Sequence, residues 1–257
     1  MDTAVTHEAL QRARELEERG FRRAAIDVLE AELAQAPELG ELWQKRAILL
    51  DREGRTAEAF DNIQRALVLS PLSVDGWLVL AQGYRRHGHR PSASSVYIDL
   101  ANGDLSPDTW LAVHDGLSSV GRWYAALSLC RRMAQQRPDD DAVYFAMAHT
   151  LARLGRPPEL SINVLRKAIG LNPAEPRYRA SLAIQLLRID RDEEAYACIA
   201  EMPLAAVESL SCRCCLQKIL QLCIDSGDAA RAAIVAGRLA KLKDASARSA
   251  KPAEGQS

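Results

Sequence analysis

Apolar side chains recur along the chain at intervals of three and four residues, a spacing that places them on one face of a helix. Ile26, Leu29 and Leu33 follow it in one segment, and Phe60 and Ile63 begin the same pattern in another. Polar residues occupy most of the positions between them. The pattern therefore predicts a series of amphipathic helices and an all-α chain.

Glycines divide these helical segments at regular intervals. Glycine can take the left-handed backbone conformation that ends a helix and lets the chain reverse. The regular spacing therefore predicts pairs of antiparallel helices. The glycines stand 34, 34, 33 and 34 residues apart, at Gly20, Gly54, Gly88, Gly121 and Gly155.

Three other residue types share the register of these glycines. A tryptophan precedes three of them by eleven residues, an alanine follows four of them by five residues, and a proline ends four of the units. The aromatic ring fills space between helices, the small side chain lets paired helices approach, and proline cannot continue the helix before it. The residues are Trp43, Trp77, Trp110, Ala25, Ala59, Ala93, Ala126, Pro37, Pro71, Pro138 and Pro173.

This pattern resembles the tetratricopeptide repeat, a helix–turn–helix unit with the signature W-x₂-L-G-x₂-Y followed by A, F and P. In the second unit, Arg46 stands in place of the signature leucine. Alanine replaces the signature glycine in two units, as Ala47 in the second and Ala81 in the third. The resemblance implies a right-handed superhelical α-solenoid of antiparallel helix pairs. The third unit matches best, through Trp77, Leu80, Ala81, Tyr84, Gly88, Ala93 and Tyr97.

Counting outward from the best units predicts about seven repeats within residues 1–243. The match is strong in the second to fourth repeats and weak in the sixth and seventh. A tail rich in Ala, Ser and Lys, residues 244–257, is predicted to be disordered. The expected repeats are 6–37, 40–71, 74–105, 107–138, 141–173, 176–207 and 209–242.

In tetratricopeptide-repeat proteins the first helix of each unit lines a concave groove that receives a partner segment, and the resemblance implies such a groove here. The family's groove positions can be transferred to this sequence one by one. The candidate partner-binding residues are Gln44, Arg52, Leu78, Gln82, Arg85, Arg86, Leu111, Asp115, Phe145, His149, Arg153 and Arg188.

Four of these residues, Arg52, Arg86, Arg153 and Arg188, occupy the same position in four units. If the units stack regularly, they form an arginine ladder along one rim of the groove. Arginine binds carboxylates through paired hydrogen bonds, so the ladder favours an acidic or C-terminal segment as the partner. Alternatively, a basic residue in the last turn of a helix complements only the helix dipole.

Charge and hydropathy narrow the functional classes. The 257 residues include 33 Lys and Arg against 34 Asp and Glu, which argues against a general nucleic-acid binder. The chain begins without an apolar signal segment and has no run of about 18 apolar residues. These features predict a cytoplasmic protein with no membrane insertion, in which the six cysteines are reduced thiols.

Four cysteines, Cys212, Cys214, Cys215 and Cys223, form the densest group of possible metal ligands. The segment from Ser209 to Ile224 has the pattern of one continuous helix, with Cys212 and Cys215 on one face. We therefore expect these cysteines to pack in the core as small apolar side chains, with metal or redox chemistry as the alternative. No metal or cofactor is predicted.

Histidines and known catalytic motifs point to no reaction. His87 and His89 flank Gly88 in what we expect to be a solvated turn, and His114 is expected to be packed and hydrogen-bonded. The sequence has no phosphate loop, nucleophile elbow, zinc-protease helix or dinucleotide fingerprint. We therefore expect a non-enzyme.

Two functional hypotheses remain. The first is an adaptor or scaffold that binds a partner peptide or helix in the groove. The second is a structural subunit of a homo-oligomer or larger assembly, such as a secretion or envelope-associated complex.

Overall fold

The computed structural model describes the backbone of residues 2–249 and the side chains of residues 7–244. Within that part of the chain all regular structure is helical, which confirms the predicted all-α fold. The helices of the first half are α1 (Asp2–Glu18), α2 (Arg22–Leu33), α3 (Gly40–Arg52), α4 (Thr56–Leu69), α5 (Val74–Arg86), α6 (Arg90–Asn102) and α7 (Trp110–Ser119). Those of the second half are α8 (Trp123–Gln136), α9 (Asp141–Arg153), α10 (Pro158–Leu171), α11 (Pro176–Leu187), α12 (Asp192–Ala200), α13 (Leu204–Glu208), α14 (Arg213–Asp225) and α15 (Ala229–Ser249).

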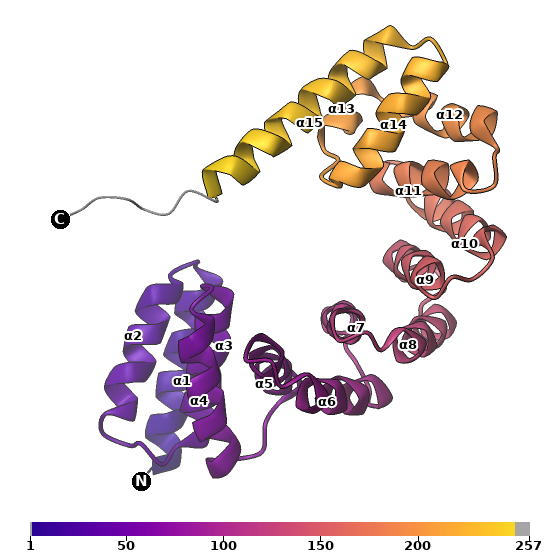
Figure 1. Cartoon of the computed structure of the whole chain (residues 1–257). Helices are drawn as coiled ribbons and strands as arrows, with labels where there is room; N and C mark the ends of the chain where they lie inside the picture. Colours follow the sequence, from indigo (N-terminus) through magenta and orange to yellow (C-terminus); the bar gives the residue numbers. More distant parts are fainter. Residues whose placement is uncertain (1, 250–257) are drawn as a thin grey trace. The chain divides into compact units, whose positions relative to one another are not determined.

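Consecutive helices pack against each other in pairs within each part of the chain. In Figure 1, α3 lies against α4 and α9 lies against α10, and the first helix of one pair also contacts the first helix of the next, as α3 contacts α5. The short helix α13 is an addition between the sixth and seventh pairs. The chain divides into two compact units within α8, residues 1–129 and 130–257, and each unit is described by itself below.

The turns inside the pairs use the left-handed conformation that the glycine spacing predicts. Gly54, for example, has φ of 78°, and the N–H of Arg55 donates to the carbonyl of Leu50 at 2.9 Å to close the end of α3. The sixth pair reverses at Asp190 with φ of 56°, where the sequence places aspartate at the turn. The other glycines with positive φ are Gly20, Gly88, Gly121, Gly155 and Gly227.

Close contact between neighbouring pairs in the first unit depends on two further glycines. A Cβ atom added to Gly83 of α5 would lie 1.9 Å from Cδ2 of Phe60, and one added to Gly116 of α7 would lie 2.2 Å from Cε1 of Tyr97. Each ring therefore packs directly on the backbone of the next first helix. These two positions leave no room for a side chain, a role that the spacing of the turn glycines does not indicate.

The C-terminal part of the chain corrects two predictions. The helix expected from Ser209 onward begins only at Arg213, because buried Val207 and Leu210 hold the preceding segment inward as α13 and a turn, and Cys212 is extended. The predicted start of the tail at residue 244 is also too early. The backbone stays helical to Ser249, which the high helix propensity of alanine and lysine explains, while residues 250–257 lie outside the described residues.

Candidate functional site

The predicted groove residues of the first unit are largely occupied by contacts within the chain. Gln44 Oε1 accepts a hydrogen bond from the N–H of Ser73 at 2.6 Å, which joins the second pair to the third. Leu78 is only 7% exposed, in a run of buried residues on α5, so the structure places this predicted groove residue in the interior. Gln82 and Arg85 are half-buried on the same helix.

Two rungs of the predicted arginine ladder form ion pairs between neighbouring first helices. Arg52 at the end of α3 pairs with Glu17 of α1 and, at 3.6 Å, with Asp75 of α5. Arg86 at the end of α5 pairs with Asp51 of α3 at 3.4 Å. The carboxylates that these arginines contact in the structure therefore belong to the chain itself.

The remaining predicted positions of the first unit lie on α7. Leu111 and Asp115 are exposed. Asp115 Oδ1 lies 3.0 Å from Nδ1 of His114, and His114 is buried against Trp110 with ring centroids 6.4 Å apart. The expectation that His114 is packed and hydrogen-bonded is confirmed.

The second unit brings two predicted residues together in one small pocket of about 140 Å³. Phe145 and His149 of α9 line it together with side chains from α11 and α14, so the first helices of three consecutive pairs contribute to one surface. Arg153 and Arg188 are exposed near the ends of α9 and α11, and Arg188 Nη1 donates to Oε1 of the pocket residue Gln185 at 2.9 Å. The full lining is Phe145, Ala148, His149, Ala152, Leu165, Ser181, Ile184, Gln185 and Cys215.

The Phe145 ring is held in place by residues of the next pair. Its centroid lies 4.9 Å from that of Tyr178, and the guanidinium of Arg177 lies 5.7 Å from the Phe145 centroid. The Tyr178 hydroxyl donates to Asp141 Oδ2, to which the Asn172 amide also donates at 3.0 Å. These hydrogen bonds, first that of Tyr178, lower the pKa of Asp141 although its partial burial opposes them.

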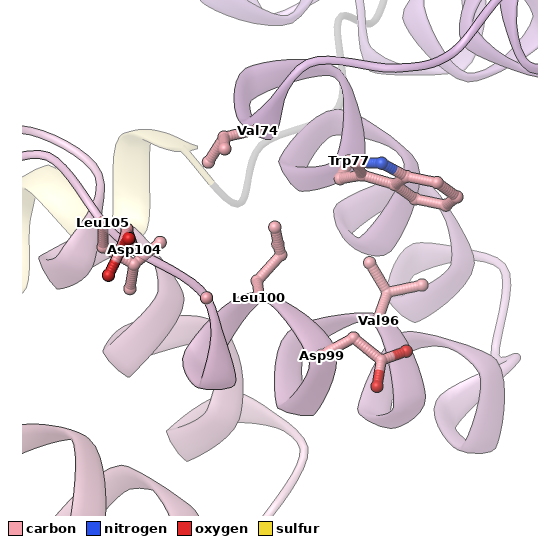
Figure 2. Close-up of a pocket in the computed structure, with 8 residues that line it drawn as sticks. Val74, Trp77, Val96, Asp99, Leu100, Asp104 and Leu105 are labelled. Atoms are coloured by element: carbon pink, nitrogen blue, oxygen red, sulfur yellow. The ribbon is translucent and has the colours of Figure 1, made fainter.

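A larger pocket of about 320 Å³ lies in the first unit between α5, α6 and the segment that follows α6. In Figure 2 the Trp77 ring lies above Val96 and Asp99 of α6, with Asp104 and Leu105 at the other end of the opening. Val74, Leu100 and Gly103 complete the lining, which is mainly apolar with two carboxylates. The groove mapping did not include any of these residues.

Three thiols meet at the start of α14. Cys212 is the residue before the helix, Cys214 and Cys215 lie in its first turn, and their three Sγ atoms all lie within 4.8 Å of one another. Cys212 and Cys214 are exposed, which corrects the prediction that they pack in the core; of the four, only Cys223 is buried. The error follows from the late start of α14, which leaves Cys212 outside the helix.

Burial and hydrogen bonding shift the pKa values of Cys212 and Cys215 in opposite directions. Partial burial raises the pKa of Cys212, but hydrogen bonds from the other two thiols and from first-turn amides outweigh it, so the pKa of Cys212 is lowered. Burial, followed by the interaction with Cys212, raises the pKa of Cys215. Cys212 therefore ionises more readily than Cys215.

Comparison with known proteins supports the fold through structure alone. No family model matches the chain, and no curated protein matches it. A tetratricopeptide repeat protein from Parabacteroides merdae is similar over 92% of both chains, with 15% identity and a TM-score of 0.66. YrrB, described as a TPR protein with an unusual peptide-binding site, matches 68% of this chain and 91% of its own at 14% identity and a TM-score of 0.55. MamA from Desulfovibrio magneticus matches 63% of this chain and 92% of its own at 18% identity and a TM-score of 0.53.

Proposed function

Because the chain has the tetratricopeptide-repeat fold, we propose that it is a protein-interaction scaffold that binds a segment of a partner protein and carries out no catalysis. Solved proteins with similar folds support a binding role, since YrrB is described as having a peptide-binding site. The proposal includes a cytoplasmic location, where the six cysteines would stay reduced. None of the described helices has the length and apolar character needed to cross a membrane.

The pocket formed by α9, α11 and α14 is the observation that carries this proposal. It combines an aromatic ring, Phe145, with aliphatic Ile184 and the polar side chains of His149 and Gln185. Such a mixture suits one apolar anchor side chain of a bound segment, with polar groups at the edge to orient its backbone. Three consecutive first helices contribute, so a partner segment lying along the pairs would contact each of them.

The preference for an acidic segment is proposed for the second unit only. Arg52 and Arg86 already contact carboxylates of the first unit, whereas Arg188 is exposed beside the pocket residue Gln185. A partner carboxylate next to the anchor residue would reach Arg188 and Arg153. The double variant Arg153→Glu with Arg188→Glu is expected to weaken partner binding more at low than at high salt.

The test of the groove fills the pocket without disturbing the core. Ala152→Arg projects a long charged side chain into the pocket, and Ala197→Arg places the same change on an exposed position of α12 as a control. Partners captured with the unmodified chain are identified by mass spectrometry and then purified, and their affinities are measured by calorimetry. We expect Ala152→Arg to weaken binding at least about tenfold and Ala197→Arg to leave it unchanged. Equal affinities of the two variants would reject groove recognition.

An exposed apolar segment on α4 favours the alternative, a structural subunit that associates with itself. Val68 is 85% exposed, and its neighbours Leu67 and Leu69 are exposed as well. Val68 and Leu69 line one open hollow with Pro37 and Trp43, and exposed apolar surface of this kind marks association sites. Light scattering during size-exclusion chromatography tests it: a dimer that Val68→Lys dissociates supports self-association, and a monomer at all concentrations rejects it.

A further inference from the structure

The second and fifth repeats supply a cation to the aromatic ring near the start of their first helix. In the second pair, the guanidinium of Arg65 lies 4.7 Å from the Trp43 ring centroid. In the fifth pair, the ammonium of Lys167 lies 4.3 Å from the Tyr144 ring centroid. Each ring belongs to the fourth residue of its first helix and each cation to the tenth residue of its second helix. The contact is therefore a feature of the repeat.

These two rings are also fixed at their polar atoms. Trp43 Nε1 donates to the carbonyl of Pro37 at 2.8 Å, and the Tyr144 hydroxyl donates to the carbonyl of Pro138 at 2.9 Å. In both cases the accepting proline precedes the ring by six residues. The cation comes from the ring's own repeat and the carbonyl from the end of the preceding one, and together they hold each ring in place.

The third pair has the ring but lacks both contacts. Trp77 is the fourth residue of α5, and the tenth residue of α6 is Asp99, so a carboxylate replaces the cation. Among the described residues, no cation stacks on Trp77 and no acceptor bonds its indole N–H. The pocket of about 320 Å³ opens at this ring, and a second carboxylate, Asp104, also lines it.

We propose that the Trp77 pocket receives a lysine or arginine side chain of a partner protein, which supplies the cation that the repeat lacks. The charged end would lie over the indole beside Asp99, and Asp104 at the other end of the opening would add negative charge to the same pocket. The aliphatic stem would contact Val96 and Leu100, as long basic side chains commonly do on apolar surfaces (Figure 2). This inference rests on the proposed scaffold function and names one chemical feature of the partner.

The first test of this proposal introduces a cation beside Trp77 by substitution within the chain. Asp99→Lys restores the residue type that stands at this position in the fifth pair, so the variant is expected to fold and to occupy its own pocket. Capped tetralysine peptide is titrated into ¹⁵N-labelled protein, with capped tetraglutamate as the control peptide. We expect tetralysine to shift the indole N–H signal of Trp77 in a saturable manner and to have no such effect in Asp99→Lys.

Variants at Arg65 test whether the response of an indole to tetralysine depends on the cation beside that ring rather than on the net charge of the chain. Arg65→Asp removes the cation from Trp43 and is expected to make the Trp43 indole respond to tetralysine, whereas Arg65→Lys is expected to leave it unresponsive. A Trp77 signal that ignores tetralysine, or that shifts equally in Asp99→Lys, overturns the inference. Repeating the titration in Ala152→Arg separates the two proposals, because this pocket should respond whether or not the groove on α9, α11 and α14 binds a partner.

The thiol cluster carries a second, independent inference. For a zinc ion with bonds of about 2.3 Å to sulfur, tetrahedral geometry requires sulfur atoms about 3.8 Å apart. The Cys212 and Cys214 Sγ atoms are 3.1 Å apart, and all three lie within 4.8 Å, so small side-chain rotations reach the required distances. The thiols also lie at the N-terminus of α14, where the positive end of the helix dipole stabilises negative charge.

We infer that Cys212, Cys214 and Cys215 bind a thiophilic metal ion, with a fourth position open to solvent or to a partner. Soft thiolate ligands select ions such as Zn²⁺ and Cu⁺ over Mg²⁺ and Ca²⁺. Two of the thiols are exposed, so an ion can enter without unfolding the chain. The third, Cys215, also lines the pocket that contains Phe145 and His149, which places the metal site beside the proposed groove.

Zinc serves as the probe for this site. Reduced full-length protein is dialysed against Zn²⁺, and bound metal is measured by mass spectrometry together with alkylation of each cysteine. We expect one zinc per chain, protection of Cys212 and Cys214 from alkylation, and loss of zinc in Cys212→Ser and Cys214→Ser but not in the control Cys198→Ser. Reduced protein that retains no zinc, or equal zinc in all three variants, overturns the inference.

Discussion

The phenol of Tyr178 donates a hydrogen bond to Oδ2 of Asp141 across 37 residues of sequence, with 2.5 Å between the two oxygens. Asp141 is the first residue of α9, and Tyr178 lies in the first turn of α11. The bond therefore holds the first helices of two consecutive pairs together at the same end. Tyr178 also packs on Phe145, so the contact positions one wall of the proposed groove.

The stability contributed by Asp141 should depend on pH. Its pKa in the folded chain is lowered, chiefly by the Tyr178 hydrogen bond. A carboxyl with a lowered folded pKa stabilises the fold fully above its ordinary pKa, and this contribution is lost as the pH falls through the lowered value. Tyr178→Phe should cost about 1 kcal/mol at pH 7 and less at pH 3, as measured by urea unfolding. Tyr84→Phe serves as the control, and an equal loss for Tyr178→Phe at both pH values would contradict the prediction.

Gly83 should tolerate no side chain. A Cβ at this position would lie 1.9 Å from Phe60, so Gly83→Ala forces the ring or the helix to move and should destabilise the chain by about 1–3 kcal/mol. Gly170→Ala adds a methyl group where no atom lies within 4 Å and should leave stability unchanged or raise it. Urea unfolding of both variants measures the difference, and equal stabilities would show that α5 has room beside Phe60.

Gly88 should be replaceable by asparagine but not by valine. Its φ of 80° lies in the left-handed region, which β-branched residues avoid and asparagine accepts. No atom lies within 4 Å of an added Cβ, so the cost of substitution comes from the backbone alone. We expect Gly88→Val to lower the thermal midpoint clearly more than Gly88→Asn does. Equal midpoints would mean that the turn does not need this conformation.

Arg46 should be coupled to Asn62. Arg46 Nη1 donates to Asn62 Oδ1 at 2.9 Å, and its Nη2 pairs with Glu30 at 2.9 Å. Replacing arginine by the signature leucine leaves the buried amide oxygen of Asn62 without this donor, which typically costs about 1–3 kcal/mol. We expect Arg46→Leu to destabilise the chain and the double variant Arg46→Leu with Asn62→Leu to recover part of the loss. Strictly additive effects in urea unfolding would exclude the coupling.

The fold was predictable because its markers are local. The spacing of Gly54 and Gly88 reflects turns whose geometry depends on a few neighbouring residues, and Trp43 and Trp77 repeat at one position of the helix pair. The arrangement of the thiols was not predictable in the same way. It depends on where α14 begins, which burial of Val207 and Leu210 decides and the helical pattern of the segment conceals.

The candidate groove was predictable only in part for a similar reason. Phe145 and His149 line one pocket of the second unit, and their role in binding a partner stays a prediction. Leu78 is buried, and Arg52 and Arg86 contact acidic residues of neighbouring helices. Which surface position is free depends on side chains about 35 residues away, such as Glu17 and Asp51, and no single repeat contains that information.

The ion pairs of Arg52 and Arg86 have a consequence for how the first unit comes apart. Each joins the first helix of one repeat to the first helix of a neighbouring repeat. Unfolding one repeat therefore leaves charges of its neighbour without their partners, which raises the free energy of a boundary between folded and unfolded repeats. High salt weakens such exposed pairs and lowers that boundary cost. The repeats are also not interchangeable, since a transplanted copy of the third pair would keep this ion pair only where its neighbour offered an acid opposite Arg86.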